Sequence, residues 1–204
     1  MIINGVEIPP AAIAGFISAF VATCGAVLVW LQWRERRLRQ DDVLKWANDV
    51  IRAQQTLYLT LFLGDSTFDA ATRRSTLARI ALDTSVLVEQ GRLFFKNTPH
   101  PTHGADRHPA YRGYRPMILD PIVVSHQIAC QWDGATDEEK DRMLIVAEDS
   151  VRSFVSMAQR EVGRGRTAHE ASAIRGEGEK LESLLPKVKA ERIAALRTSA
   201  RLSL

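Results

Sequence analysis

The longest apolar stretch of the chain lies near its N-terminus. From Ala11 to Leu31 no residue is charged, and Ser18 and Thr23 carry the only hydroxyl groups. A helix of ~21 residues rises about 31 Å, which matches the hydrocarbon thickness of a bilayer. Residues 8–33 are therefore predicted to form a transmembrane helix, after a short extracytoplasmic N-terminus of residues 1–7. A cleaved signal peptide is disfavoured because no Lys or Arg precedes the apolar run. A buried core helix seldom runs this long without a charge.

Arginines follow the apolar run directly, and basic residues are retained on the cytoplasmic side of a membrane. The pattern predicts a single-pass protein of the bacterial inner membrane, with its N-terminus outside and its large remainder in the cytoplasm. The residues expected at the membrane interface are Trp30, Trp33, Arg34, Arg36, Arg37 and Arg39. Small residues also repeat every three or four positions, which lets helix backbones approach closely in lipid. This predicted helix-association face comprises Ala12, Gly15, Ala19, Ala22 and Ala26.

The helical pattern continues beyond the arginines. Neither proline nor glycine interrupts the chain between Trp33 and Gly64, so residues 34–63 are predicted to form a juxtamembrane stalk helix. Its apolar face, with one polar position at Gln54, comprises Val43, Ala47, Val50, Leu57 and Leu61, flanked by Leu44, Ile51 and Tyr58. Such a helix either pairs with its copy in a second chain or packs on its own domain, and the second use is commoner.

Three further helices are expected in residues 64–163. The first begins at a capping box of Ser66 and Asp69 and stops at Gly91. The second begins at Asp120–Pro121 and runs to Trp132, and the third begins at the capping box of Thr136 with Glu139 and runs to Val162. Their predicted buried residues are Leu77, Ile80, Ala81, Leu87, Val88, Met143, Leu144, Ala147, Val151, Phe154, Val155 and Ala158.

A loop rich in proline and glycine, residues 97–116, joins the first two of these helices. Residues 164–204 read as a charged, partly flexible C-terminal tail with short helical pieces at 180–185 and 188–200. No alternation long enough to build a sheet is found. The predicted fold is all-α, with one transmembrane helix, a stalk and a small cytoplasmic helical bundle.

Charge narrows the expected partners. The net charge of +3 and pI near 9.1 are only mildly basic, and much of the excess lies in the arginines after the apolar run and in the tail. This placement favours anionic lipid headgroups over a nucleic-acid groove, so a lipid bilayer is an expected partner and a specific nucleic acid is not. Cys24 and Cys130 are not expected to meet, which fits a reducing compartment.

Three arginines and two tyrosines gather at the two ends of the loop: Arg92, Tyr111, Arg112, Tyr114 and Arg115. Arginine forks bind phosphate or carboxylate through two parallel hydrogen bonds, and tyrosines offer a stacking face. These residues are therefore a candidate site for a nucleotide-like or lipid-phosphate ligand. The alternative, which we favour from the sequence, is that the arginines pair internally with Glu89, Asp120 or Asp83 and hold the loop to the bundle.

Other chemistry is weakly indicated. His100, His103 and His108, with Asp106, are ligand types for a metal, but their spacing fits no established frame, so solvated loop histidines and no metal are expected. No phosphate-binding glycine loop, metalloprotease helix pair or zinc cysteine set is present. We therefore expect no enzyme activity and no cofactor.

The runs GRLFFKN and AYRGYRPMILDPIV resemble a segment of uncharacterised bacterial proteins that have one N-terminal span and a helical cytoplasmic domain. The resemblance covers residues 85–124 and the arrangement of the N-terminal segment, and it implies a bacterial membrane protein. The leading functional hypothesis is a membrane-anchored interaction or signalling module that acts as a homo-oligomer or with a protein partner. The alternative is a membrane-permeabilising effector of a bacterial defence or toxin system, and an enzyme with its site at the loop comes third.

Overall fold

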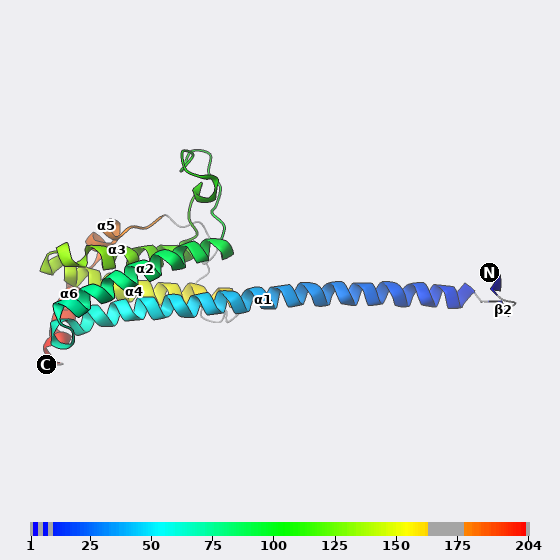
Figure 1. The fold of residues 1–204 in the computed structure, drawn as a ribbon, viewed down its shortest axis with the longest axis horizontal. Coiled ribbons are helices and arrows are strands. Elements are labelled where there is room, and N and C mark those ends of the chain that lie inside the picture. Colours follow the sequence, from blue (N-terminus) through cyan, green and yellow to red (C-terminus); the bar gives the residue numbers. More distant parts are fainter. Residues whose placement is uncertain (1, 4–5, 8–9, 163–177, 203–204) are drawn as a thin grey trace. The chain divides into compact units, whose positions relative to one another are not determined.

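The computed structural model describes residues 2–3, 6–7, 10–162 and 178–202 (Figure 1). Side chains are described for residues 18–34, 38–64, 67–162 and 178–198. The chain divides into two compact units, Met1–Asp42 and Val43–Leu204, and helix α1 (Pro10–Thr67) runs from the first unit into the second. The described residues are almost wholly helical, which confirms the predicted all-α class.

The first unit begins with two very short strands, β1 (Ile2–Ile3) and β2 (Val6–Glu7), which pair antiparallel. The first part of α1 follows, with Pro10 at its first helical position, where a missing backbone N–H costs nothing. All described side chains from Ser18 to Arg34 are exposed, and the guanidinium of Arg34 lies 5.7 Å from the Trp30 ring centroid. Trp30 and Trp33 are each about half exposed.

Among the described residues, no helix combines the length and the apolar character needed to cross a bilayer. This finding contradicts the predicted transmembrane helix 8–33 and the single-pass inner-membrane location that followed from it. The effector hypothesis depended on a spanning helix and is not carried further.

The residues assigned to that span are exposed wherever their side chains are described. Ala19, Ala22 and Ala26 of the small-residue face are exposed, whereas the side chains of Ala12 and Gly15 lie outside the described residues. Arg34 and Arg39 are exposed side chains of α1, and the side chains of Arg36 and Arg37 again lie outside the described set. The membrane-interface role given to these aromatic and basic residues has no support in the structure.

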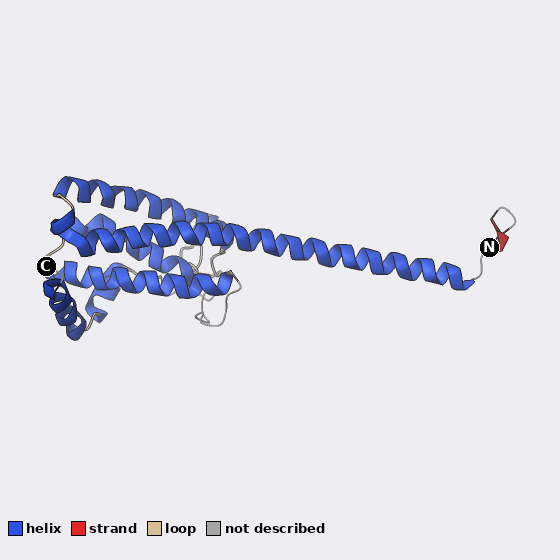
Figure 2. Ribbon diagram, turned by 90° about the horizontal axis from the view of Figure 1, so that it is seen from below, coloured by secondary structure: helices blue, strands red, loops and turns tan. Residues whose placement is uncertain are grey.

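The second unit is a bundle of four long helices (Figure 2): the part of α1 from Val43 onward, α2 (Ala70–Phe94), α3 (Asp120–Gln131) and α4 (Asp137–Glu161). Other helical segments complete it, namely η1 (Pro109–Tyr111), η2 (Met117–Leu119), η3 (Trp132–Gly134), α5 (Leu181–Leu184), η4 (Leu185–Lys187) and α6 (Ala190–Leu202). All four long helices contribute side chains to both of its apolar core clusters.

The apolar face predicted on α1 is confirmed. Its members are Val43, Ala47, Val50, Gln54, Leu57 and Leu61, and all are buried. They pack against α2, α3 and α4, so this part of α1 packs on its own domain. The one polar member, Gln54, donates from Nε2 to Ser125 Oγ at 3.1 Å. Trp46, which the pattern did not select, is also buried and donates from Nε1 to the Leu87 carbonyl oxygen at 2.9 Å.

Two predicted helix boundaries differ from the structure. Gly64 interrupts α1 as expected, with φ +53° and ψ −145°, but α2 is capped by Asp69, whose carboxylate accepts from the Ala71 and Thr72 N–H groups. Gly91 does not stop α2, which continues to Phe94. A Cβ at Gly91 would lie 2.5 Å from Leu119 Cδ2 and 2.8 Å from Trp46 Cζ2. Glycine is therefore needed there for close packing and not for a turn.

The starts of α3 and α4 follow the sequence closely. Thr136 and Glu139 form the predicted capping box, with Thr136 N to Glu139 Oε2 at 2.8 Å. Hydrogen bonding to Thr136 lowers the pKa of the Glu139 carboxyl. Asp120 is the first residue of α3 and not its N-cap, which is Leu119. The side chain of Asp120 is turned instead toward an arginine of the preceding loop.

The C-terminal segment packs more closely than expected of a charged tail. Leu181 of α5 is fully buried in the core cluster formed with α3 and α4, and its N–H donates to Gln127 Oε1 at 2.8 Å. Arg192 of α6 forms a two-pronged ion pair with Asp149 of α4. Residues 163–177 of the predicted tail lie outside the described residues. Residues from Gly178 to the end of α6 belong to the second unit.

Candidate functional site

The segment between α2 and α3 folds back on itself. Thr98 and Tyr114 pair as an isolated antiparallel bridge, with backbone N···O distances of 2.8 and 2.9 Å. The ring of His103 stacks on that of Tyr114, with 4.2 Å between centroids. Gly113 has φ +81°, and any Cβ there would collide with the Thr98 carbonyl oxygen, so the turn requires glycine. The predicted loop 97–116 therefore has a defined shape.

A cleft of about 630 Å³ lies between the last turns of α2 and this loop. That volume is within the range of about 300–1,000 Å³ that is usual for small-molecule sites. Its polar lining residues are Glu89, Arg92, Lys96, Asn97, His100 and Arg112. Its more apolar wall consists of Leu93, Phe95, Pro99, Pro109, Ala110 and Tyr111. Three of the five predicted site residues, Arg92, Tyr111 and Arg112, thus line one cleft.

Arg92 is held within the cleft by internal partners. Its Nε lies 3.3 Å from Glu89 Oε1, and its Nη1 donates to Asn97 Oδ1 at 3.3 Å. The guanidinium also lies 4.8 Å from the centroid of the Tyr111 ring, at cation–π distance. The Tyr111 hydroxyl donates to the other Glu89 oxygen at 3.1 Å. Arg92, Glu89 and Tyr111 therefore form a closed group that joins α2 to the loop.

Arg112 and Lys96 differ from Arg92 because neither has a carboxylate partner among the described residues. Arg112 donates from Nε to the Arg107 carbonyl oxygen at 3.1 Å, and its own carbonyl accepts from Asn97 Nδ2 at 3.0 Å. Lys96 lies two residues after the end of α2, and its side chain is exposed. Lys96 and Asn97 were not selected from the sequence. Lys96 could have been found from the sequence, because it directly follows the apolar run Leu93–Phe95 at the start of the loop.

Arg115 lies outside the cleft lining and pairs internally. Its Nε donates to Asp120 Oδ1 at 2.6 Å, and its Nη2 donates to the Glu179 carbonyl oxygen at 3.4 Å. Asp120 is only 3% exposed, and its burial raises the pKa of the carboxyl above the ordinary value, although the positive charge of Arg115 acts in the opposite direction. Arg115 thus joins the loop to α3 and to the C-terminal segment, as the structural alternative predicts for this residue.

Tyr114 also lies outside the cleft lining, and its ring packs with two of the loop histidines. His103 stacks on it, and His100 meets it edge-on with 5.0 Å between centroids. Nδ1 of His100 accepts from the His103 backbone N–H at 3.1 Å. Within the described residues, no three His, Cys, Asp or Glu side chains are grouped closely enough to hold a metal ion.

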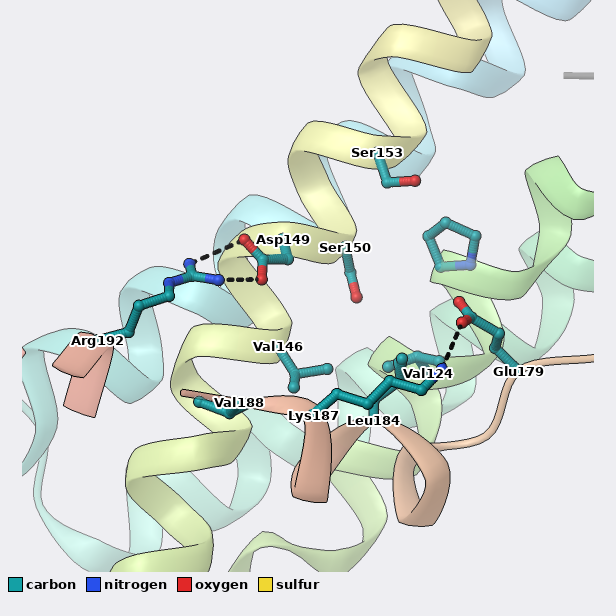
Figure 3. A pocket seen from close by; sticks show the side chains of 11 residues that line it. Val124, Val146, Asp149, Ser150, Ser153, Glu179, Leu184, Lys187, Val188 and Arg192 are labelled. Atoms are coloured by element: carbon teal, nitrogen blue, oxygen red, sulfur yellow. Dashed lines mark hydrogen bonds and ion pairs between the residues drawn. The ribbon is translucent and has the colours of Figure 1, made fainter. Parts of the chain in front are cut away.

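A second, smaller cavity of about 160 Å³ lies between α3, α4 and the C-terminal segment. Figure 3 shows the two ion pairs at its edges, Arg192 with Asp149 and Lys187 with Glu179. Its volume falls below the usual range for a ligand site. Lys187 and Glu179 both belong to the C-terminal segment, and Arg192 connects this segment to Asp149 of α4. The cavity is therefore best explained as a packing gap along the interface of this segment with the bundle.

The outer face of α2 carries a second feature that the sequence interpretation missed. Leu82, Val86 and Leu93 are 70%, 56% and 82% exposed. At about 100° per residue they lie within about 40° of one another around the helix. The buried residues of α2 lie on the opposite side: Leu77, Ile80, Thr84, Leu87, Val88 and Gly91. The helix therefore has two apolar faces, and we call Leu82, Val86 and Leu93 the outer face of α2.

No protein-family model, curated protein or solved structure matches this chain. The resemblance of residues 85–124 to uncharacterised bacterial proteins stays a prediction.

Proposed function

We propose that the second unit is an interaction or signalling module that acts as a homo-oligomer, and that two copies associate through the outer face of α2. The supporting observation is the exposure of three large apolar side chains on one side of a helix whose other side is fully used by the core. Several large apolar side chains exposed on one helix face are typical of an interaction site.

The charges beside the outer face favour a second copy of the same chain. Leu82, Val86, Glu89 and Leu93 are spaced by four, three and four residues, as in the seam of a coiled coil, and Arg79 continues this spacing. In an antiparallel pair of α2 helices centred on Thr84, Leu82 of each copy faces Val86 of the other. The same register places Arg79 opposite Glu89 twice, once on each side of the two-fold axis.

Both members of this expected charge pair are accessible. Arg79 is exposed and has no ion-pair partner among the described residues, and the Glu89 side chain is about half exposed despite its contacts to Arg92 and Tyr111. One helix face per copy gives an interface at the small end of specific protein contacts, so we expect weak association, on the order of micromolar.

Charge reversal in the full-length protein tests this arrangement. Arg79→Glu and Glu89→Arg each place like charges opposite one another, so each is expected to weaken dimerisation at least about tenfold. The protein that carries both substitutions restores the attraction with inverted signs and is expected to recover dimerisation. Sedimentation equilibrium over a range of concentrations measures the dimerisation constant of the parent, the two single variants and the double variant.

A second test is Leu82→Glu, which places a charge in the outer face. Its matched control is Leu59→Glu, because Leu59 is an exposed leucine of α1 that lies outside the outer face. Only Leu82→Glu is expected to reduce association. Equal effects of the two leucine substitutions, or no recovery in the doubly reversed protein, would reject the antiparallel α2 contact. A parent protein that stays monomeric at all concentrations would likewise reject the proposed dimer.

A further inference from the structure

We infer that the cleft at the end of α2 binds a small organic phosphate monoester, with the phosphate at Arg112 and Lys96 and the organic part against the apolar wall. This inference goes beyond the proposed self-association. Arg112 and Lys96, which hold the phosphate, take no part in the dimer contact, whereas Glu89 and Leu93 belong to both surfaces.

The charge of the cleft fits a dianion. Arg92, Lys96 and Arg112 line it together with one carboxylate, Glu89, so the formal charge of the lining is two positive with His100 neutral. Arg92 and Glu89 satisfy each other, and this leaves the charges of Arg112 and Lys96 without a carboxylate among the described residues. A phosphate monoester carries about −1.5 to −2 charges near neutral pH, which matches these two cations better than a single carboxylate does.

Hydrogen bonds within the loop fix the position of Arg112. Asn97 bonds through its Oδ1 to Arg92 and through its Nδ2 to the Arg112 carbonyl oxygen, so it connects α2 to the part of the loop that carries Arg112. The Arg112 side chain is oriented by its bond to the Arg107 carbonyl oxygen, which uses only Nε. Its two terminal nitrogens have no hydrogen-bond partner among the described residues and are suited to bind a phosphate.

The apolar wall of the cleft indicates which organic group the phosphate ester carries. Leu93 is largely exposed at the cleft, and Pro99, Pro109 and Ala110 add apolar surface without hydrogen-bond donors in their side chains. A free phosphate leaves this surface wet, whereas an aromatic or aliphatic ester covers it. We therefore expect a phosphate with an apolar substituent to bind more tightly than inorganic phosphate.

Isothermal titration of the full-length protein with phenyl phosphate, inorganic phosphate and benzyl alcohol tests the inference. Phenyl phosphate is expected to bind more tightly than inorganic phosphate, and benzyl alcohol is expected to give no binding because it lacks the anion. Arg112→Gln and Lys96→Gln are each expected to weaken phenyl phosphate binding by about tenfold, the loss of one charged hydrogen bond. Added salt is expected to weaken it further.

Arg74→Gln is the matched control, because Arg74 is an exposed arginine about 27 Å from Arg92 along the same helix and belongs neither to the cleft lining nor to the proposed dimer contact. It is expected to leave phenyl phosphate binding unchanged, whereas Arg112→Gln is expected to leave dimerisation unchanged. Circular dichroism of each variant checks that the helices remain. Phenyl phosphate binding that is absent in the parent, or equal in the parent and Arg112→Gln proteins, overturns the inference and leaves the proposed dimer untouched.

Discussion

Arg115, which is partly buried, forms an ion pair with the buried Asp120 and so connects the loop to α3. Arg115→Ala would leave the Asp120 carboxylate buried without its cation, and breaking such a pair costs on the order of 3–5 kcal/mol. We therefore expect the free energy of unfolding at neutral pH to fall by about this amount, a large share of the total of about 5–15 kcal/mol for a domain. Urea unfolding of the full-length parent and variant measures the difference.

The same substitution predicts a pH dependence with a definite sign. Burial already raises the pKa of Asp120, and removing Arg115 raises it further. The folded variant then binds a proton at pH values where the unfolded chain, with an aspartate pKa of about 3.9, has lost it. Its stability deficit relative to the parent should accordingly shrink as the pH falls from 7 toward about 4.

An exposed arginine–aspartate pair provides the control for both measurements. Arg74 and Asp133 are 3.0 Å apart, and both side chains are largely accessible to water. Arg74→Ala is expected to cost about 0–1 kcal/mol at any of these pH values. If Arg115→Ala lowered the free energy of unfolding no more than this control does, Arg115 would not be a structural residue. It would then again be a candidate ligand-binding residue.

The arginines show how far residue-level inference from sequence reaches. Pairing of Arg92 with Glu89 and of Arg115 with Asp120 was among the sequence alternatives, because each pair is separated by only three or five residues. Gly91 was misassigned as a helix stop because a stop glycine and a packing glycine look alike locally. What distinguishes them is Trp46, which lies 45 positions away in sequence.

At the scale of elements, the C-terminal segment gives the clearest prediction. Leu181 is fully buried although α5 is only one turn long, and its backbone N–H is bonded to Gln127 of α3. Leu181→Ala is therefore expected to lower the free energy of unfolding by about 2–5 kcal/mol, the usual cost of a cavity in a core. Chemical denaturation of the full-length protein measures it.

Leu59→Ala on α1 is the matched control, because this leucine is about half exposed and should cost no more than about 0.5 kcal/mol. Similar small effects of both substitutions would mean that the segment after Gly178 contributes little to the fold. A large effect of Leu181→Ala alone would establish α5 as part of the core, against its interpretation as a tail.

The elements themselves were largely predictable. Periodicity and capping residues located the four long helices, and the box of Thr136 with Glu139 fixed the start of α4. The attachment of α5 was not predictable, because its few apolar residues carry no periodic signal and its core partners lie on α3 and α4. The outer face of α2 was predictable in principle, since Leu82, Val86 and Leu93 share one side of the helix.

At the scale of the whole molecule, the loop site shows a limit of sequence patterns. Arg92, Tyr111 and Arg112 were correctly expected to come together, because they flank one loop whose ends must meet. Tyr114 and Arg115 follow Gly113, after which the chain turns away from the cleft toward α3. Arg112 and Arg115 point in different directions because Thr98 pairs with Tyr114 in an isolated bridge. No local sequence pattern predicts that bridge.

The division into two units predicts that the second one folds without the first. Every residue of both core clusters lies at Val43 or later, and the described side chains from Ser18 to Arg34 are exposed. A fragment from Gln40 to Leu204 keeps all of these core residues. Its new helix start would carry Asp41 and Asp42, and acidic residues there interact favourably with the helix dipole.

We therefore expect this fragment and the full-length protein to unfold in urea with the same midpoint, followed by circular dichroism. A shorter fragment that begins at Thr56 is the control, because it loses Trp46, Val50 and the rest of the first half of the core face of α1. Deleting that much buried surface removes more stability than a domain of this size holds in reserve, so the shorter fragment should show no cooperative transition. A midpoint for the longer fragment well below that of the whole chain would show that residues before Gln40 stabilise the bundle. Equal transitions in the two fragments would place the core elsewhere than on α1.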